Sequence, residues 1–294
     1  MRERKRTNRR LSVQQLEARN LFATVSLTSG GVVEVIDDVG VANVVTINGH
    51  SENLVIKDTA GFTDVPDDFI QVSATEVRLR DQGVQAVHLH LNGGDDRVTA
   101  GGSQLPTKMW LGGGEDVVVA GSKVTDHIWG GIGNDDITGY GGTDYLYGEI
   151  GNDTLRAFSG DGNVLVGGPG NDDLAGGNAQ DSLYGGAGND KLNGRGGDDF
   201  LDGGGGHDVL RGGTGEDTMR GGAGHDLFFA KLSGHDQDAE VNGGAGDDVL
   251  YTRDLGKVTN PDLELAMEYD VPGFLKARSG FTLRDFRDWV NYWP

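Results

Sequence analysis

Apolar residues follow two different patterns along the chain. Between residues 24 and 129 they alternate with polar residues over short stretches, as in Val32–Ile36 and residues 87–91. Alternation with period two is typical of a strand with one buried face, so we expect β-strands in this part. From Gly130 onward, a single large apolar residue returns at intervals of nine, with a variable residue on each side. This second pattern predicts very short strands that recur at a fixed interval.

The interval of nine belongs to a glycine-rich nonapeptide repeat. Seven copies follow one another over residues 167–229, three more occupy 130–156, and a further copy begins at Gly243. A ten-residue segment, 157–166, separates the two blocks. The eighth residue of each copy is large and apolar: Ile137, Leu146, Leu155, Leu174, Leu183, Leu192, Leu201, Leu210, Met219, Phe228 and Leu250. The sixth residue is always aspartate: Asp135, Asp144, Asp153, Asp172, Asp181, Asp190, Asp199, Asp208, Asp217, Asp226 and Asp248.

The nine residues of a copy divide into a turn and a strand. Glycines near positions one, two and four permit positive φ angles and so a sharp turn. The last three residues form a strand that points its single apolar side chain inward. Two copies make one coil, and coils stack about 4.8 Å apart, so residues separated by one coil share a face. Two opposite columns of aspartates are therefore expected: Asp172, Asp190, Asp208 and Asp226 in one, and Asp181, Asp199 and Asp217 in the other.

Carboxylates stacked in columns repel one another. Two unit charges about 5 Å apart cost roughly 3 kcal/mol at an effective dielectric near 20, and one apolar side chain per copy offers little burial to offset this. Calcium resolves the conflict, because it takes about six to eight oxygens from carboxylates and backbone carbonyls. We therefore predict Ca²⁺ as the cofactor, with the sixth-position aspartates as its ligands. We also expect the repeat region to fold only when calcium is bound.

The consensus G-G-x-G-x-D-x-apolar-x resembles the repeats-in-toxin (RTX), or hemolysin-type calcium-binding, repeat. The resemblance covers residues 130–251. It implies a right-handed parallel β-roll, calcium between stacked turns, and export from the cell. The predicted fold class is thus all-β, a parallel β-roll or β-helix solenoid with a C-terminal helical and aromatic cap.

Some copies depart from the consensus. Ala179 stands at position four of one copy, and Glu149 and Arg195 stand at position two of two others. Because each of these copies keeps its aspartate, we expect weakened rather than absent calcium sites. The ten-residue segment offers Asp161 and Asn163 in place of the usual aspartate. The columns of ligands should therefore break near residue 157.

The flanking segments complete a four-part organisation. Residues 1–23 form a basic N-terminal segment that we expect to be disordered or related to export. Residues 24–129 are predicted to be β-helix coils that precede the nonapeptide β-roll of residues 130–251, with a separate β-sandwich over residues 21–85 as the alternative. Residues 252–294 are rich in aromatic side chains and are predicted to cap the open end of the roll or to serve as an export signal.

One N-terminal stretch adds to the case for export. Residues 16–23, Leu-Glu-Ala-Arg-Asn-Leu-Phe-Ala, resemble the LEPR-XLL domain of large bacterial surface or secreted proteins. The stretch departs from that family at Ala18, where the family has proline, and at Phe22, where it has leucine.

Composition excludes several classes of function. The chain has 46 acidic and 25 basic residues and a net charge of −21, so nucleic acid is not expected as a partner. Without cysteine, neither disulfides nor thiolate metal sites are available. No stretch approaches the roughly 20 apolar residues of a transmembrane segment. We predict an extracellular protein, secreted or associated with the cell surface, with a structural or adhesive role. Its expected partners are calcium and extracellular polysaccharide or cell-surface components.

The sequence also bears on two other functions. The chain lacks H-E-x-x-H and G-x-S-x-G, so no enzyme is predicted. The alternative is an extracellular polysaccharide lyase or epimerase that carries the repeats, with four suspect acids: Asp95, Asp96, Glu115 and Asp116. Degenerate calcium turns explain these acids better. A further hypothesis is zinc binding by His207 and His225, which lie eighteen residues apart.

Overall fold

The computed structural model describes the greater part of the chain, and the statements below concern that part. The described residues are 23–37, 42–50, 53–58, 62–63, 65, 69–73, 75–79, 83–121, 123–160, 162–230, 240–246, 248–252 and 265–268. All regular structure among them is β-strand. The LEPR-XLL-like stretch lies almost wholly outside the described residues, and so does the predicted helical cap, apart from one short strand at Leu265–Glu268.

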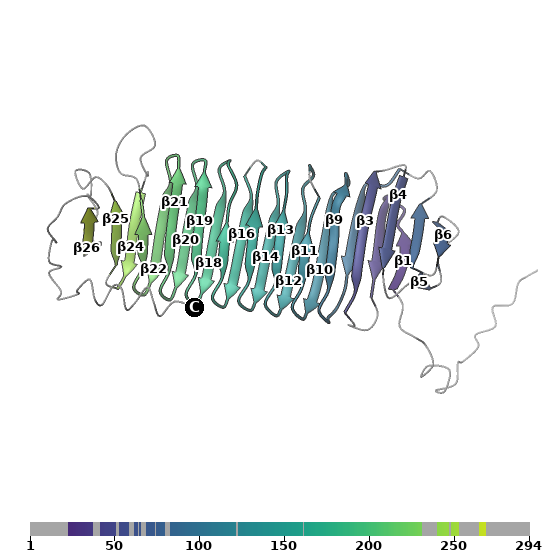
Figure 1. Cartoon of the computed structure of the whole chain (residues 1–294), viewed down its shortest axis with the longest axis horizontal. Helices are drawn as coiled ribbons and strands as arrows, with labels where there is room; N and C mark the ends of the chain where they lie inside the picture. The colour runs from purple at the N-terminus through teal and green to yellow at the C-terminus, as the bar shows by residue number, and fades with distance from the viewer. Residues whose placement is uncertain are drawn as a thin grey trace, which may run out of the picture.

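Two long sheets face each other along an extended molecule (Figure 1). Sheet 1 has the order β24-β22-β20-β18-β16-β14-β12-β10-β8-β2-β1-β5 and sheet 2 the order β26-β25-β23-β21-β19-β17-β15-β13-β11-β9-β3-β4-β7-β6. The strands of sheet 1 are β1 (Ala23–Leu27), β2 (Val32–Ile36), β5 (Phe62–Thr63), β8 (Ala86–His90), β10 (Thr107–Gly113), β12 (His127–Ile132), β14 (Tyr145–Ile150), β16 (Val164–Pro169), β18 (Ser182–Ala187), β20 (Phe200–Gly205), β22 (Thr218–Ala223) and β24 (Glu240–Ala245). Those of sheet 2 are β3 (Val44–His50), β4 (Asn53–Asp58), β6 (Phe69–Ser73), β7 (Glu76–Leu79), β9 (Arg97–Ser103), β11 (Val117–Val119), β13 (Asp136–Gly139), β15 (Thr154–Ala157), β17 (Asp173–Ala175), β19 (Lys191–Gly196), β21 (Val209–Thr214), β23 (Leu227–Phe229), β25 (Val249–Thr252) and β26 (Leu265–Glu268).

The chain alternates between the two sheets, and this alternation makes a parallel β-roll. Each strand from β8 to β23 pairs in parallel with the strand two places later, so one coil consists of one strand from each sheet. Within the uninterrupted repeats the register advances by eighteen residues, as in Ser182↔Phe200. Earlier coils are longer, because Lys108 pairs with His88 and also with His127. The coil length predicted from the nonapeptide is therefore present in the fold.

The N-terminal end departs from the simple parallel coils predicted for residues 24–129. Strands β2 and β3 join the roll by parallel pairing with β8 and β9. Strands β1, β4, β7 and β6 add antiparallel pairs outside them. The reason is the length of the connections, because a connection as short as that between β3 and β4 permits only a hairpin. These hairpins continue the two sheets and cover the edge strands of the first coil.

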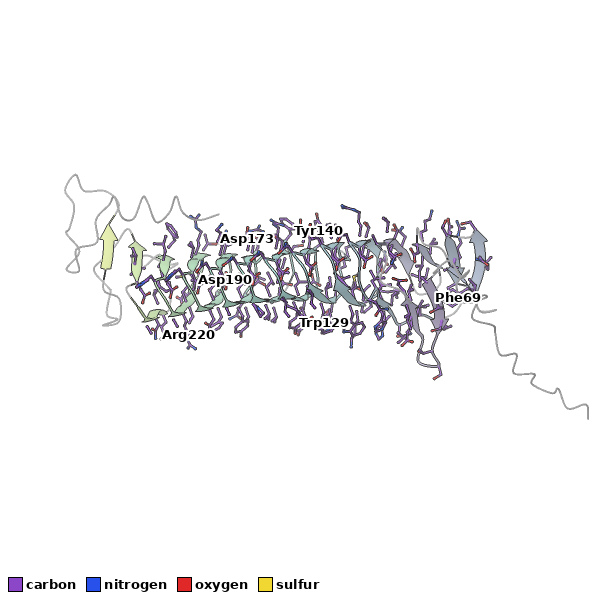
Figure 2. All side chains as sticks on the ribbon, turned by 90° about the horizontal axis from the view of Figure 1, so that it is seen from below. Phe69, Trp129, Tyr140, Asp173, Asp190 and Arg220 are labelled. Atoms are coloured by element: carbon purple, nitrogen blue, oxygen red, sulfur yellow. The ribbon has the colours of Figure 1, made fainter. Side chains whose placement is uncertain are left out.

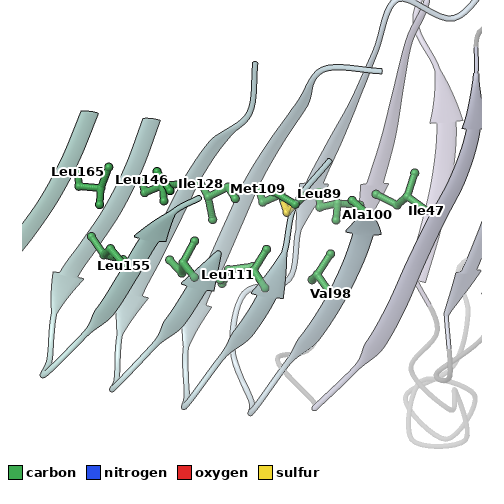
Figure 3. Close-up of a cluster of buried hydrophobic side chains, with 14 of the residues drawn as sticks. Ile47, Leu89, Val98, Ala100, Met109, Leu111, Ile128, Leu146, Leu155 and Leu165 are labelled. Carbon is green, nitrogen blue, oxygen red and sulfur yellow. The ribbon is translucent and has the colours of Figure 1, made fainter. Parts of the chain in front are cut away.

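The core lies between the sheets and thins along the molecule. Strands near the N-terminus carry two inward apolar side chains each, such as Val87 and Leu89 on β8, both fully buried. Repeat strands carry one, such as Leu146, and these form a single row per sheet (Figure 3). Each coil of the nonapeptide region thus buries far less apolar surface than the coils that precede it.

An aromatic stack covers the outer face of the early coils. His90, Trp110, Trp129 and Tyr147 lie on consecutive strands of sheet 1 with nearly parallel rings, and their centroids are 4.4, 5.0 and 5.5 Å apart. Figure 2 shows Trp129 on the outside of the roll. Because the rings face one another, each covers part of its neighbour's surface, and this packing stabilises the early coils.

Two departures from the consensus occupy strained backbone positions. Position two of most copies is a glycine with positive φ, such as Gly186 at 118°. Glu149 and Arg195 adopt φ angles of 72° and 74° at the same position. Arg195 has a compensating contact, since its guanidinium lies 5.1 Å from the ring of Phe158. Glu149 has an exposed side chain and no comparable contact to offset its strain.

Replacing Glu149 by glycine should therefore stabilise the protein. The left-handed conformation costs a non-glycine residue about 1–2 kcal/mol, which the substitution removes. Glycine is more flexible in the unfolded chain, and this entropy opposes the gain by about 0.5–1 kcal/mol. We expect a net gain of about 0.5–1 kcal/mol in the free energy of unfolding, measured by urea denaturation with calcium present. The control is Glu216→Gly, an exposed acidic residue outside the positive-φ set, which should lose stability. Equal losses in both variants would contradict this explanation.

Candidate metal sites

Buried aspartates line the two edges where the chain turns from one sheet to the other. Column 1 consists of Asp96, Asp116, Asp135, Asp153, Asp172, Asp190, Asp208, Asp226 and Asp248. Column 2 consists of Asp126, Asp144, Asn163, Asp181, Asp199 and Asp217. These side chains are at most 2 % exposed. All the sixth-position aspartates of the repeats therefore lie in one of the two columns, in the grouping that the eighteen-residue spacing predicts.

A side-chain-to-backbone ladder holds each column together. The backbone N–H of Asp172 donates to Oδ1 of Asp190 at 2.8 Å, and that of Asp190 donates to Oδ1 of Asp208 at 2.8 Å. The same bond links Asp181 to Asp199 in column 2. Each carboxylate thus fixes the turn of the preceding coil, and its own orientation is fixed in return.

In most of these aspartates the second carboxylate oxygen has no such partner. Oδ2 is buried without a hydrogen bond in Asp96, Asp116, Asp135, Asp144, Asp153, Asp172, Asp190, Asp199, Asp208 and Asp226. Burial, followed by repulsion from neighbouring carboxylates, raises the pKa of Asp208 to about 8, and burial also raises the pKa values of Asp172 and Asp199 to about 7. A buried, unpaired carboxylate is costly, so these oxygens require a proton or a cation.

In several repeat turns, Oδ2 shares a narrow space with a carbonyl oxygen of the next coil. This space exists because position one of the repeat is glycine. A Cβ added to Gly185 would lie 2.6 Å from the carbonyl oxygen of Gly203 on the next coil, and closer still to Oδ2 of Asp190. A Cβ on Gly194 would meet the carbonyl of Gly212 and Oδ2 of Asp199 in the same way. A side chain at position one would therefore collide with both oxygens, whereas glycine lets a carboxylate oxygen and a carbonyl oxygen converge, as the all-oxygen ligand set of calcium requires.

The donor set also suits calcium. Among the described residues, no three histidine, aspartate or glutamate side chains lie close enough to hold an ion by themselves. An ion in this space would take one carboxylate oxygen per turn and complete its shell with backbone carbonyls. Calcium accepts such mixed, all-oxygen coordination, whereas zinc prefers nitrogen and sulfur ligands.

The two degenerate turns before the repeats lack this space. Asp96 and Asp116 belong to the ladder of column 1, but their turns have Leu91 and Leu111 at position one. Both leucine side chains are fully buried. Burial raises the pKa of Asp96 to about 8, so a proton can neutralise it at neutral pH. The degenerate turns therefore follow the repeat in backbone and ladder, but not in the glycine that leaves room for an ion.

The four acids of these turns form a buried pair and an exposed pair. Asp96 and Asp116 are buried between the sheets at 2 % and 1 % exposure, out of reach of a polymer substrate. Asp95 and Glu115 are exposed, and Oδ1 of Asp95 accepts the backbone N–H of Glu115 at 2.9 Å. Their positions are explained by the packing of successive turns.

A second ladder of side-chain-to-backbone hydrogen bonds, at position five of the repeat, was not predicted from the sequence. In column 1 the side chain at this position accepts the backbone N–H of its counterpart on the next coil, through Asn134, Asn152, Asn171, Asn189 and His207 in turn. The recurrence of asparagine at this spacing was the available signal. Nδ1 of His207 accepts the N–H of His225, and the rings stack 5.0 Å apart. One nitrogen of the proposed zinc pair is therefore engaged in the ladder.

The ten-residue segment affects the two columns differently. Column 1 passes it intact, because the N–H of Asp153 donates to Oδ1 of Asp172 at 2.7 Å across a spacing of nineteen residues. In column 2 the neutral side chain of Asn163 takes the place of an aspartate. The predicted break is thus wrong for column 1, where the extra residue is absorbed without displacing the carboxylates.

Comparison with known families agrees with this geometry. The RTX calcium-binding nonapeptide repeat (four copies) matches residues 124–155, 159–192, 166–201, 193–228 and 233–254. Residues 124–254 therefore carry hemolysin-type calcium-binding repeats. No curated protein matches the chain. In the described part of the chain, no helix has the length and hydrophobicity needed to cross a membrane.

The raised pKa values predict an unusual pH dependence for the metal-free protein. The carboxyls of the unfolded chain titrate near their ordinary pKa of about 4, whereas Asp190 and Asp208 titrate near 6 and 8 in the fold. As the pH rises between these values the unfolded chain loses protons first, so the metal-free fold loses stability. With chelator present, the urea midpoint should be higher at pH 5 than at pH 8. A midpoint that rises with pH would contradict the burial of unpaired carboxylates.

Proposed function

We propose that this chain is an extracellular calcium-binding protein whose repeat region folds when calcium fills the spaces between stacked turns. The observation that carries the proposal is made at repeat aspartates such as Asp172, Asp190 and Asp208. Their buried Oδ2 has no hydrogen bond and lies beside a position-one glycine and a carbonyl oxygen of the next coil. In each turn the ion would be held by the sixth-position aspartate and by backbone carbonyls. Calcium supplies the positive charge that allows these carboxylates to remain ionised together.

Coupling between folding and calcium follows from the uneven core. The early coils bury two apolar side chains per strand and carry the aromatic stack, so they hold together without an ion. A repeat coil buries one side chain per strand, such as Leu183 and Leu192, and must order many glycines. Ordering glycine is entropically expensive. We infer that the early coils act as a template on which calcium-loaded coils are added.

A structural or adhesive role outside the cell suits these properties. The roll is long and narrow (Figure 1), and its repeated unit makes its length adjustable without a change of architecture. Extracellular modules bind calcium at about 10⁻⁴–10⁻³ M, so such sites would fill only after export. In this proposal the chain is not an enzyme and is secreted or held at the cell surface. Polysaccharide and other cell-surface components are its expected partners.

The repeats should need calcium in order to fold, whereas the early coils should be folded without it. In chelator we expect reduced β-sheet circular dichroism that rises with added calcium, with magnesium as the control ion. Trp110 and Trp129 report on the early coils, and their near-ultraviolet signal should change little in the same titration. Complete β-sheet signal in chelator would overturn the proposed coupling.

Substitutions of two neighbouring aspartates can distinguish the loss of a calcium ligand from the loss of a negative charge at the surface. Asp172 lies in column 1, whereas Asp173 points away from the roll (Figure 2). Asp172→Asn should remove the negative charge from one ion site, so calcium affinity should fall by about tenfold or more at that site and the number of bound ions should decrease. Asp173→Asn removes the same charge from the surface and should leave both unchanged. Isothermal titration calorimetry distinguishes them, and identical titrations would count against the assignment.

A further inference from the structure

We propose that Asp181, although it stands at the ligand position of its repeat, binds no calcium, because hydrogen bonds from the polypeptide take the place of the ion. The inference rests on the proposed function and narrows it to particular turns. Column 2 would then be interrupted at Asn163 and Asp181, while column 1 continues past the same coils.

The hydrogen bonds of Asp181 differ from those of its neighbours in the column. Oδ1 of Asp181 accepts both the backbone N–H and the side-chain Nδ2 of Asn163, each at 2.8 Å. Oδ2 accepts the backbone N–H of Gly177 at 2.5 Å. In Asp199, one coil later, Oδ1 accepts the N–H of Asp181 and Oδ2 has no partner. Asp181 thus has three donors where an ion-binding aspartate has one.

A second residue of column 2 shows the same arrangement independently. Oδ1 of Asp126 accepts the N–H and the hydroxyl of Thr107, at 2.9 and 2.6 Å. Its Oδ2 accepts the backbone N–H of Gly121 at 2.9 Å. In both cases the preceding coil presents a neutral donor side chain, Asn163 or Thr107, in place of an aspartate. The carboxylate then accepts an N–H of its own turn with the oxygen that would otherwise face an ion.

The sequence of the turn explains why this alternative is available at Asp181. Its copy has Ala179 at position four, where the other turns have glycine with positive φ, such as Gly188 at 131°. Gly177, at position two, lies outside the positive-φ set that includes Gly186. The turn therefore has a different backbone, and in this backbone the N–H of Gly177 points at the carboxylate. The sequence predicted a weakened calcium site in the copy that contains Ala179. We infer instead that hydrogen bonds close this turn and that no calcium binds there.

Matched amide substitutions in the full-length chain test the inference. Asp181→Asn removes an acceptor for Gly177 but no calcium ligand, so the number of bound ions should equal that of the wild type. Asp199→Asn removes a ligand and should lower the number by at least one. Equilibrium dialysis with elemental analysis gives both counts. Loss of an ion in Asp181→Asn would overturn the inference, whereas a wild-type protein that binds no calcium would overturn the proposed function itself.

The metal-free protein offers a readout that does not depend on bound calcium. In chelator at pH 5, where the metal-free fold is expected to be more stable than at pH 8, Asp181→Asn should lower the melting temperature, because a buried N–H loses its acceptor. Asp199→Asn should not lower it, because Oδ2 of Asp199 accepts no hydrogen bond that the substitution would remove. Shifts of the same sign in both variants would contradict the inference.

If Asp181→Asn does not fold, a variant designed to gain a calcium site tests the same inference. Asn163→Asp combined with Ala179→Gly restores the consensus on both coils and removes the Nδ2 donor. We expect this double variant to bind at least one more calcium ion than the wild type. An unchanged count would show that the hydrogen bonds do not exclude the ion.

Discussion

The hydrogen bond from one aspartate N–H to the Oδ1 of the aspartate on the next coil constrains the rest of this structure. It fixes the spacing of the coils, because the donor and acceptor must lie on adjacent turns. It also fixes the orientation of every carboxylate, so that Oδ2 points into the fold beside the glycine at position one. Once Oδ2 is buried there, the turn must supply a proton, a cation or a donor to stabilise it.

Different turns have features that suit each of these three solutions. Burial raises the pKa of Asp96 to about 8, and Leu91 fills the place of the glycine, so a proton suffices there. Asp181 receives donors from Asn163 and Gly177. The remaining repeat turns combine a buried Oδ2, a glycine and a nearby carbonyl, which is the combination that suits a calcium ion. In the proposed function, stabilisation by apolar and aromatic packing therefore changes to stabilisation by calcium ions along the length of the roll.

The sequence predicted the regular part of this arrangement because strand alternation and the nonapeptide interval are strict. The inward apolar rows, the coil of eighteen residues and the two columns of aspartates all follow from the positions of residues such as Leu192 and Asp190. The N-terminal hairpins did not follow, because alternation gives the face of a strand but not the direction of its partner. The roles of Asn163 and Leu91 also depend on contacts one coil away. These contacts become visible only when the register is known, since the chain carries them 18 to 20 residues apart.

The most direct test of the account is a crystal structure of the calcium-loaded chain, with anomalous scattering used to locate the ions. The account predicts ions beside Gly185 and Gly203, each about 2.3–2.6 Å from Oδ2 of the sixth-position aspartate and from carbonyl oxygens of the adjoining coils. Ions located only at the exposed faces of the sheets, or an ordered repeat region with no ions between its turns, would contradict it.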